Sequence, residues 1–79
     1  MENSAEQPEA VSAVGVEKFL DAVVTVTVKD GRKFKGKLTQ FDEHMNLLLE
    51  DAEELKAEGP AAKYKLILLK GGNVTAVSI

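Results

Sequence analysis

The strongest constraint on the fold is a pair of alternating segments joined by Asp30-Gly31. The first, residues 23–29 (VVTVTVK), alternates valine with threonine, as a half-buried strand requires. The second, residues 32–41, alternates apolar residues and glycine with lysine and threonine. An Asp-Gly pair is typical of a two-residue type I′ turn between antiparallel strands. We therefore predict a β-hairpin whose second strand bends at Gly36, because glycine within a strand usually marks a bend.

One short helix and three further strands are predicted elsewhere in the chain. The spacing i, i+3, i+4 of Val16, Phe19 and Leu20 gives a short helix one apolar face. Residues 50–62 are mostly polar and acidic, which predicts a loop with room for one helical turn. The predicted elements are a helix at residues 14–21 and strands at residues 23–29, 32–41, 47–49, 64–69 and 73–79. The fold class is therefore mostly β, with a short N-terminal helix followed by a strongly bent, five-stranded antiparallel open barrel.

The first 12 residues contain acids, proline, serine and alanine without a hydrophobic period. Such a composition cannot offset the entropy lost on ordering, so we predict a flexible acidic tail at residues 1–12 and one domain at residues 13–79. The tail holds Glu2, Glu6 and Glu9, which account for the formal net charge of −3. Because the domain itself is close to neutral, a nucleic-acid site must come from a local arrangement of side chains.

Cysteine is absent from the 79 residues. This excludes disulfides and thiolate metal sites, which often reinforce domains of this size. No stretch approaches the roughly 20 apolar residues of a membrane span, and no signal peptide is evident. We therefore predict a cytoplasmic protein without metal, cofactor or membrane association, since a reducing compartment suits a chain without cysteine. Association between subunits is the remaining source of extra stability.

Two apolar runs, residues 47–49 (LLL) and 66–69 (LILL), do not alternate. Both faces of these strands therefore favour burial, and one small barrel cannot cover both. An open barrel also leaves two edge strands with unpaired backbone groups. Pairing of one edge with the other edge of an identical subunit satisfies both demands. Such head-to-tail pairing gives a closed ring if the rotation closes and a filament if it does not.

Three segments carry a resemblance to a known family: residues 30–38 (DGRKFKGKL), 41–47 (FDEHMNL) and 67–74 (ILLKGGNV). The first two together resemble the Sm1 motif, and the third resembles the Sm2 motif, of the Sm-like (Lsm) family in its archaeal branch. The resemblance extends over nearly all of residues 16–79. It implies the Sm fold and a ring of six or seven subunits, in which the fourth strand of one subunit pairs with the fifth strand of its neighbour.

The same resemblance implies one RNA pocket per subunit, built from the turns of the two motifs and opening towards the pore. It assigns base stacking to His44 and reading of the base edge to Asn46. It implies that Asp42 orients Asn46, that Lys70 forms the opposite wall, and that Gly71 and Asn73 shape the second turn. The chemistry fits uridine, because uracil presents a donor at N3 and an acceptor at O4, and a carboxamide can meet both. A single-stranded base is also free to stack on an imidazole.

Two residues depart from the family pattern, which commonly has arginine at the position of Lys70 and an acid at that of Gly72. A lysine ammonium cannot stack as a guanidinium plane does, so we expect weaker or less uridine-selective binding. Simpler readings of these residues remain open. His44 could be a solvated turn residue, Asp42 and Asn46 an Asx-type turn, and Lys70 a turn cap. A basic cluster on the second strand could bind phosphate or discourage aggregation; it consists of Arg32, Lys33, Lys35 and Lys37.

The leading hypothesis for function is a homo-oligomeric ring that binds uridine-rich single-stranded RNA and scaffolds RNA processing or turnover, with RNA-processing proteins as further partners. The alternative is a structural or protein-assembly ring with weak or no RNA binding. An enzyme is not predicted, because the chain has one histidine, no cysteine and no spacing typical of a catalytic triad or metal site.

Overall fold

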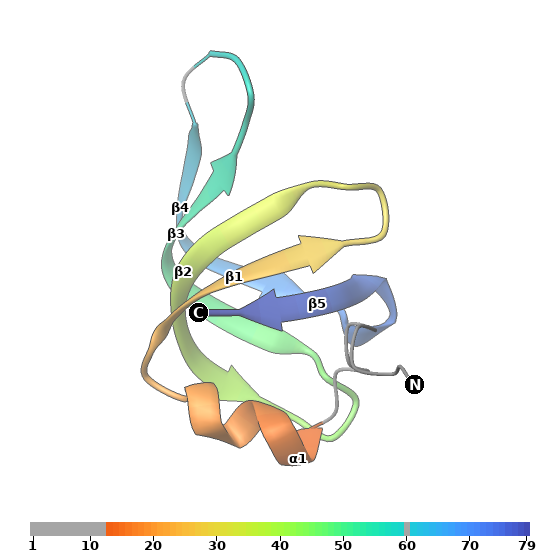
Figure 1. The fold of residues 1–79 in the computed structure, drawn as a ribbon. Helices are drawn as coiled ribbons and strands as arrows, with labels where there is room; N and C mark the ends of the chain where they lie inside the picture. Colours follow the sequence, from red (N-terminus) through yellow and green to blue (C-terminus); the bar gives the residue numbers. More distant parts are fainter. Residues whose placement is uncertain (1–12, 60) are drawn as a thin grey trace.

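The computed structural model describes residues 13–59 and 61–79, so the predicted tail at residues 1–12 lies outside the described residues. The elements are α1 (Ala13–Val16), η2 (Glu17–Phe19), β1 (Val23–Val28), β2 (Lys33–Phe41), β3 (Leu47–Leu55), β4 (Ala62–Leu69), η3 (Gly71–Asn73) and β5 (Val74–Ser78). The strands form one antiparallel sheet in the order β4-β3-β2-β1-β5. Figure 1 shows the sheet curling so that its two edges, β4 and β5, approach one another. The predicted mostly β open barrel with five strands is confirmed.

The N-terminal helix is shorter than predicted. It consists of four α-helical residues and a three-residue 3-10 turn that ends at Phe19. Asp21 has a φ of 70°, in the left-handed region, so a right-handed helix cannot continue through it. The backbone nitrogen of Asp21 instead donates a 2.7 Å hydrogen bond to the carbonyl of Leu38. Tertiary pairing with β2 therefore ends the helix before residue 21.

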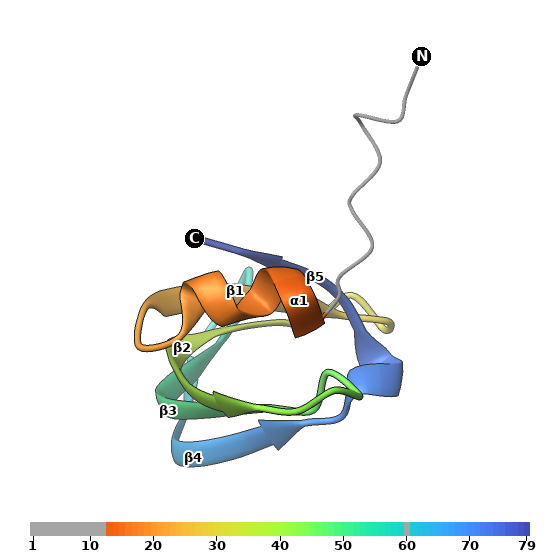
Figure 2. The same cartoon turned by 90° about the horizontal axis from the view of Figure 1, so that it is seen from below.

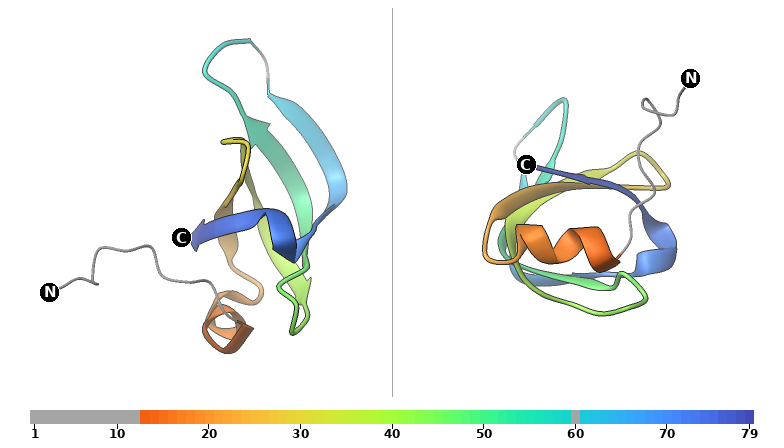
Figure 3. Two further views of the ribbon diagram at one scale, coloured as in Figure 1. Left: turned by 90° about the vertical axis from the view of Figure 1, so that its right-hand side faces the viewer. Right: turned by 60° about the horizontal axis from the view of Figure 1, so that its bottom comes forward.

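The prediction of a long polar loop at residues 50–62 is wrong. β3 continues to Leu55 and β4 begins at Ala62, so the two strands form a hairpin. Figure 3 shows this hairpin projecting from the end of the molecule opposite the helix. Polar side chains are compatible with a strand here because, apart from the buried Ala52, the side chains of residues 50–55 are exposed or half-buried. Cross-strand backbone pairing, rather than burial, holds these residues extended.

The turn between β1 and β2 also differs from the predicted two-residue type I′ turn. Gly31 has a φ of 98°, whereas Asp30 is not among the residues with positive φ. The backbone nitrogen of Gly31 donates to the carbonyl of Val28 at 2.9 Å, and that of Val28 donates to the carbonyl of Arg32 at 3.0 Å. This is a three-residue turn with a glycine bulge. The Asp30 carboxylate favours it by accepting hydrogen bonds from the backbone and side chain of Arg32 at 3.0 and 2.8 Å.

The barrel interior is filled by alternate residues of the strands and closed by Val16 from α1 and Met45 from the β2–β3 turn. The remaining buried residues are Val24, Val26, Val28, Phe34, Leu38, Leu47, Leu49, Ala52 and Leu69. Gly36, where a bend was predicted, also allows close approach of β2 and β3, because a Cβ there would lie 2.9 Å from both Cα and Cβ of Ala52.

Asp51 changes which residues of β3 face the interior. Its φ of 52° is in the left-handed region, and the β2–β3 register shifts between Lys35 and Lys37. Buried residues of β3 therefore run Leu47, Leu49 and then Ala52, instead of continuing at every second position. This bulge increases the bend of the sheet.

Candidate nucleic-acid interface

The candidate site begins in the β2–β3 turn, residues 42–46, where one carboxylate organises the backbone. The Oδ1 atom of Asp42 accepts hydrogen bonds from the backbone nitrogens of His44 and Asn46 at 2.9 and 3.0 Å. Its Oδ2 atom accepts a 2.9 Å hydrogen bond from the side-chain nitrogen of Asn46. These three bonds fix both the turn and the plane of the Asn46 carboxamide. The expected Asx-type turn is therefore present.

The electrostatic state of Asp42 follows from these contacts. The backbone hydrogen bond from Asn46, followed by its side-chain hydrogen bond, lowers the pKa of the Asp42 carboxyl below its ordinary value of 3.8. Hydrogen bonds donated to the charged form favour that form. Asp42 therefore remains a carboxylate, able to accept all three bonds, throughout the neutral and mildly acidic range.

The second turn of the site lies directly beside the first. Figure 2 shows the β2–β3 turn next to η3, although they are distant in sequence. The backbone nitrogen of Gly71 donates a 2.8 Å hydrogen bond to the Oδ1 atom of Asn46. A Cβ on Gly71 would overlap the carbonyl group of His44. Glycine is therefore required at residue 71 because the two backbones touch there.

The Asn46 carboxamide keeps hydrogen-bonding capacity after these contacts. One of its two N–H donors serves Asp42, and one of its two oxygen lone pairs serves Gly71. One donor and one acceptor remain, side by side and in a fixed plane. This is the complement of a base edge that presents an acceptor next to a donor, as the O4 and N3 groups of uracil do.

The remaining predicted site residues lie in the same two turns. The imidazole of His44 is 75% exposed, with its Nε2 atom 3.8 Å from a carboxylate oxygen of Glu43. Lys70 precedes η3 and is exposed, and its carbonyl accepts a 2.9 Å hydrogen bond from the backbone of Asn73. The carbonyl of Asn73 in turn accepts a 2.8 Å bond from the backbone of Lys29. All six predicted residues thus lie in two adjacent turns, whereas their contacts with RNA remain predictions.

Met45 also belongs to this turn, although the sequence analysis did not identify it as a site residue. It has a φ of 65° and is 8% exposed, so the turn is anchored in the barrel core at this point. The sequence signal that could have identified it is an apolar residue between two polar residues of a predicted turn. Gly72, in contrast, has free space around the position of a Cβ and no positive φ.

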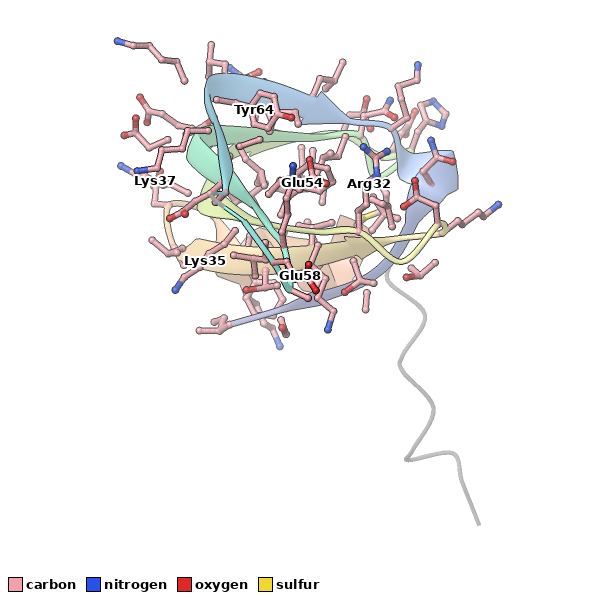
Figure 4. The ribbon with its side chains drawn as sticks, turned by 90° about the horizontal axis from the view of Figure 1, so that it is seen from above. Arg32, Lys35, Lys37, Glu54, Glu58 and Tyr64 are labelled. Carbon is pink, nitrogen blue, oxygen red and sulfur yellow. The ribbon has the colours of Figure 1, made fainter. Side chains whose placement is uncertain are left out.

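The basic cluster predicted on β2 divides into two parts. Figure 4 shows Lys35 and Lys37 on the outer side of the barrel and Arg32 turned towards its mouth. The Arg32 guanidinium carbon lies 5.5 Å from the centre of the Phe34 ring, and the Phe34 and Tyr64 rings are 6.4 Å apart. Tyr64 of β4 therefore packs against Phe34 with one side of its ring while remaining partly exposed. No single face gathers all four basic side chains, which weakens the phosphate-binding reading.

Within residues 13–59 and 61–79, no group of three or more histidine, cysteine, aspartate or glutamate side chains could hold a metal ion. Across the same part of the chain, none of the helices has the length and apolar character needed to cross a membrane.

Comparison with known proteins gives relatives over most of the chain. An snRNP Sm-like protein of Methanosarcina acetivorans is 42% identical over 59 residues, which cover 75% of this chain and 82% of the relative. One of Thermococcus kodakarensis is 41% identical over 63 residues, covering 80% and 83%. Both relatives are snRNP Sm-like proteins.

The solved structures that match this chain are also those of Sm-like proteins. The Methanococcus vannielii SmAP (LSm) protein matches with a TM-score of 0.73 and 35% identity, covering 84% of this chain and 90% of that one. The Pyrococcus abyssi Sm protein in complex with a uridine heptamer matches with a TM-score of 0.78 and 33% identity, covering 87% and 97%. A heptameric archaeal Sm protein matches with a TM-score of 0.75 and 35% identity, covering 84% and 96%. Since the model of the LSM domain also matches residues 15–79, the chain belongs to this family and is an Sm-like protein of the archaeal type.

Proposed function

We propose that this chain forms a ring of six or seven identical subunits and binds uridine-rich single-stranded RNA at the paired turns of each subunit. One observation carries the proposal: the Asn46 carboxamide is held between the Asp42 carboxylate and the Gly71 backbone, with one donor and one acceptor left over. The relatives support it, since one solved Sm protein is a heptamer and another was solved with a uridine heptamer.

In this proposal each site residue has a separate task. The leftover donor of Asn46 meets O4 of uracil, and the leftover acceptor meets the N3 proton. The exposed imidazole of His44 stacks on the base, which is worth roughly 1–3 kcal/mol and depends little on base identity. Asp42 orients Asn46, while Gly71 and Asn73 hold the second turn against the first. Selectivity for uridine therefore comes from Asn46, whereas general affinity comes from His44 and charge.

Lys70 completes the site on the other side of the base, but differently from a stacking arginine. Its ammonium is a compact charge rather than a plane, so it attracts phosphate more than it sandwiches a base. Gly72 beside it has no side chain that could orient it. We therefore expect a strong dependence on salt and a modest preference for uridine over adenosine, partly offset by repetition of the site around a ring.

Ring formation follows from the exposed edges of the sheet. β4 and β5 lie at opposite edges of the strand order, and each is paired on one side within the subunit. Leu66 and Leu68 of β4 are 58% and 57% exposed, which is unusual for neighbouring leucines of a strand. A cavity of about 340 Å³ opens beside Leu68 and the Phe34 and Tyr64 rings. Pairing of β4 with β5 of a neighbour would cover these leucines and satisfy both backbone edges.

The experiment is fluorescence anisotropy with labelled oligouridine and oligoadenosine at two salt concentrations, together with light scattering. We expect the mass of six or seven chains and tighter binding of oligouridine than of oligoadenosine. A ring that binds neither oligomer at low salt would leave the structural-ring alternative. A monomer at micromolar concentration would contradict the assembly.

The wider role proposed is that of a cytoplasmic, non-enzymatic scaffold in RNA processing or turnover, with RNA-processing proteins as partners. Incubation of labelled RNA with the purified ring tests the non-enzymatic part, because RNA remaining intact is the expected result. We also propose that residues 13–79 form the folding unit. Deletion of residues 1–12 should then leave the melting temperature nearly unchanged, and should modestly raise RNA affinity at low salt by removing three negative charges.

A further inference from the structure

Met45 lies between the two residues proposed to contact the base, yet its own side chain points into the barrel. Its φ of 65° is a backbone conformation that residues other than glycine rarely adopt. The side chain is 8% exposed and belongs to the buried cluster that includes Leu47 and Leu69. His44, in contrast, is exposed. Burial of an apolar side chain therefore offsets an unfavourable backbone conformation at this point.

We infer that Met45 is the positioning residue of this site, whose burial locks the turn that presents His44 and Asn46 to RNA. This inference rests on the proposed function and deepens it, because it makes selectivity for uridine depend on a residue that does not touch RNA. The base-reading geometry is then built into the free protein rather than formed when RNA binds.

The hydrogen bonds on either side of Met45 show how the lock acts. The backbone nitrogens of His44 and Asn46 both donate to the same oxygen of Asp42, at 2.9 and 3.0 Å. Two nitrogens that are two residues apart can share one acceptor only because the chain reverses at Met45. The backbone nitrogen of Met45 itself donates to the Asp42 carbonyl at 3.0 Å. Release of Met45 from the core would therefore loosen the carboxylate contacts that orient the Asn46 carboxamide.

The lock extends to the second turn through a close backbone contact. A Cβ on Gly71 would lie 2.9 Å from the carbonyl carbon of Met45, so the two turns touch at this residue. Gly71 also donates to the Asn46 side chain. Movement of Met45 would thus change both the orientation of the carboxamide and the surface against which the second turn rests.

A purely structural role for Met45 makes a different prediction from a positioning role. Loss of packing alone lowers the melting temperature and weakens binding of every RNA to the same extent. Loss of positioning acts on base reading, so oligouridine binding falls more than oligoadenosine binding. Base stacking and phosphate attraction tolerate a small displacement of the turn, whereas a hydrogen-bonded base edge does not.

Three variants of the full chain separate these roles. Met45→Gly adopts a positive φ freely but buries no side chain, Met45→Ala is a milder truncation, and Met45→Leu is the control that keeps apolar bulk. Anisotropy with both oligomers measures affinity, and light scattering checks assembly. Amide hydrogen exchange at Asn46 and Gly71 reports the lock directly, and the amide of Val26, in the strand that pairs with both β2 and β5, is the internal control.

We expect Met45→Leu to match the wild type in affinity and exchange. Met45→Gly should bind oligouridine about tenfold more weakly if the turn then holds the binding geometry about a tenth of the time. Its binding of oligoadenosine should change little, and exchange at Asn46 and Gly71 should accelerate while Val26 stays protected. Should Met45→Gly fail to assemble, Met45→Ala is expected to show the same pattern to a smaller extent.

Equal losses for the two oligomers, or unchanged oligouridine affinity in an assembled ring with accelerated exchange, would overturn the inference. If the wild type binds no oligouridine, the proposed function fails by itself. In that case exchange at Asn46 and Gly71 still decides whether Met45 locks the turns, and unchanged exchange in Met45→Gly would show that it does not.

Discussion

The backbone nitrogen of Gly71 donates a 2.8 Å hydrogen bond to the side-chain oxygen of Asn46, across 25 residues of sequence. This bond joins the two turns of the site and uses one lone pair of the carboxamide proposed to read uracil. Because Asp42 holds the other end of the same carboxamide, the group cannot rotate to suit another base. Uridine preference is thus tied to the docking of one turn on the other.

Gly71 and Gly72 form a matched pair for testing this docking. Gly71→Ala should destabilise the domain by about 1–3 kcal/mol and abolish most oligouridine binding, because the new methyl group would overlap the carbonyl group of His44. Gly72→Ala is the control, since a Cβ there meets nothing within 4 Å. It should leave stability unchanged or raise it by about 0.4–1 kcal/mol. Urea unfolding and anisotropy on both variants check this, and equal behaviour of the two would contradict the observed contact.

Replacing His44 with alanine and replacing Asn46 with alanine should have different effects on RNA binding. His44→Ala should weaken binding of oligouridine and oligoadenosine alike, by roughly 1–3 kcal/mol per stacked base. Asn46→Ala should reduce oligouridine binding most and so narrow the difference between the two oligomers. Lys70→Arg should strengthen both by supplying a planar group. Anisotropy at two salt concentrations separates base contacts from phosphate attraction, and a uniform loss in Asn46→Ala would argue against its reading role.

Leu68 on the exposed edge of β4 provides a test of assembly. Leu68→Lys should convert the ring to smaller species, because a charge would have to be buried against the neighbouring subunit. Leu55→Lys is the control, since Leu55 is also an exposed leucine, 40% accessible, but β3 lies within the sheet rather than at its edge. Light scattering should show a ring for Leu55→Lys and smaller species for Leu68→Lys. A full ring in Leu68→Lys would exclude this edge from the interface.

The lowered pKa of Asp42 predicts how the stability of the domain changes in acid. Its pKa is lowered mainly by the backbone hydrogen bond from Asn46, so its contribution to stability is complete above the ordinary value of 3.8 and is lost as the pH falls through the lowered value. The melting temperature should therefore decline below about pH 4. In Asp42→Asn this decline should be smaller, although Asp30, whose pKa is also lowered by contacts with Arg32, retains its own part. An identical acid profile in both proteins would show that the Asp42 contacts do not persist in solution.

The alternating patterns of β1 and β2 predicted these strands correctly, because period-two burial is a local property that one strand carries in its own residues. The six candidate site residues were also named from the sequence, since their motifs are short and contiguous, and the structure places them in two adjacent turns. The turn at Asp30 and Gly31 was placed correctly but assigned the wrong type. Hydrogen bonds from the backbone and side chain of Arg32 to the Asp30 carboxylate favour the three-residue form, and an Asp-Gly pair alone does not reveal them.

The length of the β3–β4 hairpin could not be predicted from composition. Residues 50–55 are polar and acidic, and hydrophobicity alone suggests a loop there. Their extended form comes from backbone pairing with β2 and β4, which depends on where the neighbouring strands lie. The left-handed backbone of Asp51, after which burial passes from Leu49 to Ala52, likewise accompanies a register shift between β2 and β3 that the residues of β3 alone do not reveal.

The sequence by itself determined that the chain forms a bent β-hairpin with further strands and that two polar turns carry an asparagine, a histidine and a lysine. Alternation and short motifs suffice for this, because each acts within a few residues. Only the tertiary structure decided that Gly71 rests on the backbone of His44 and that Met45 anchors the turn from within the core. These contacts join residues distant in sequence, and their energies exist only when the barrel has closed and brought the two turns together.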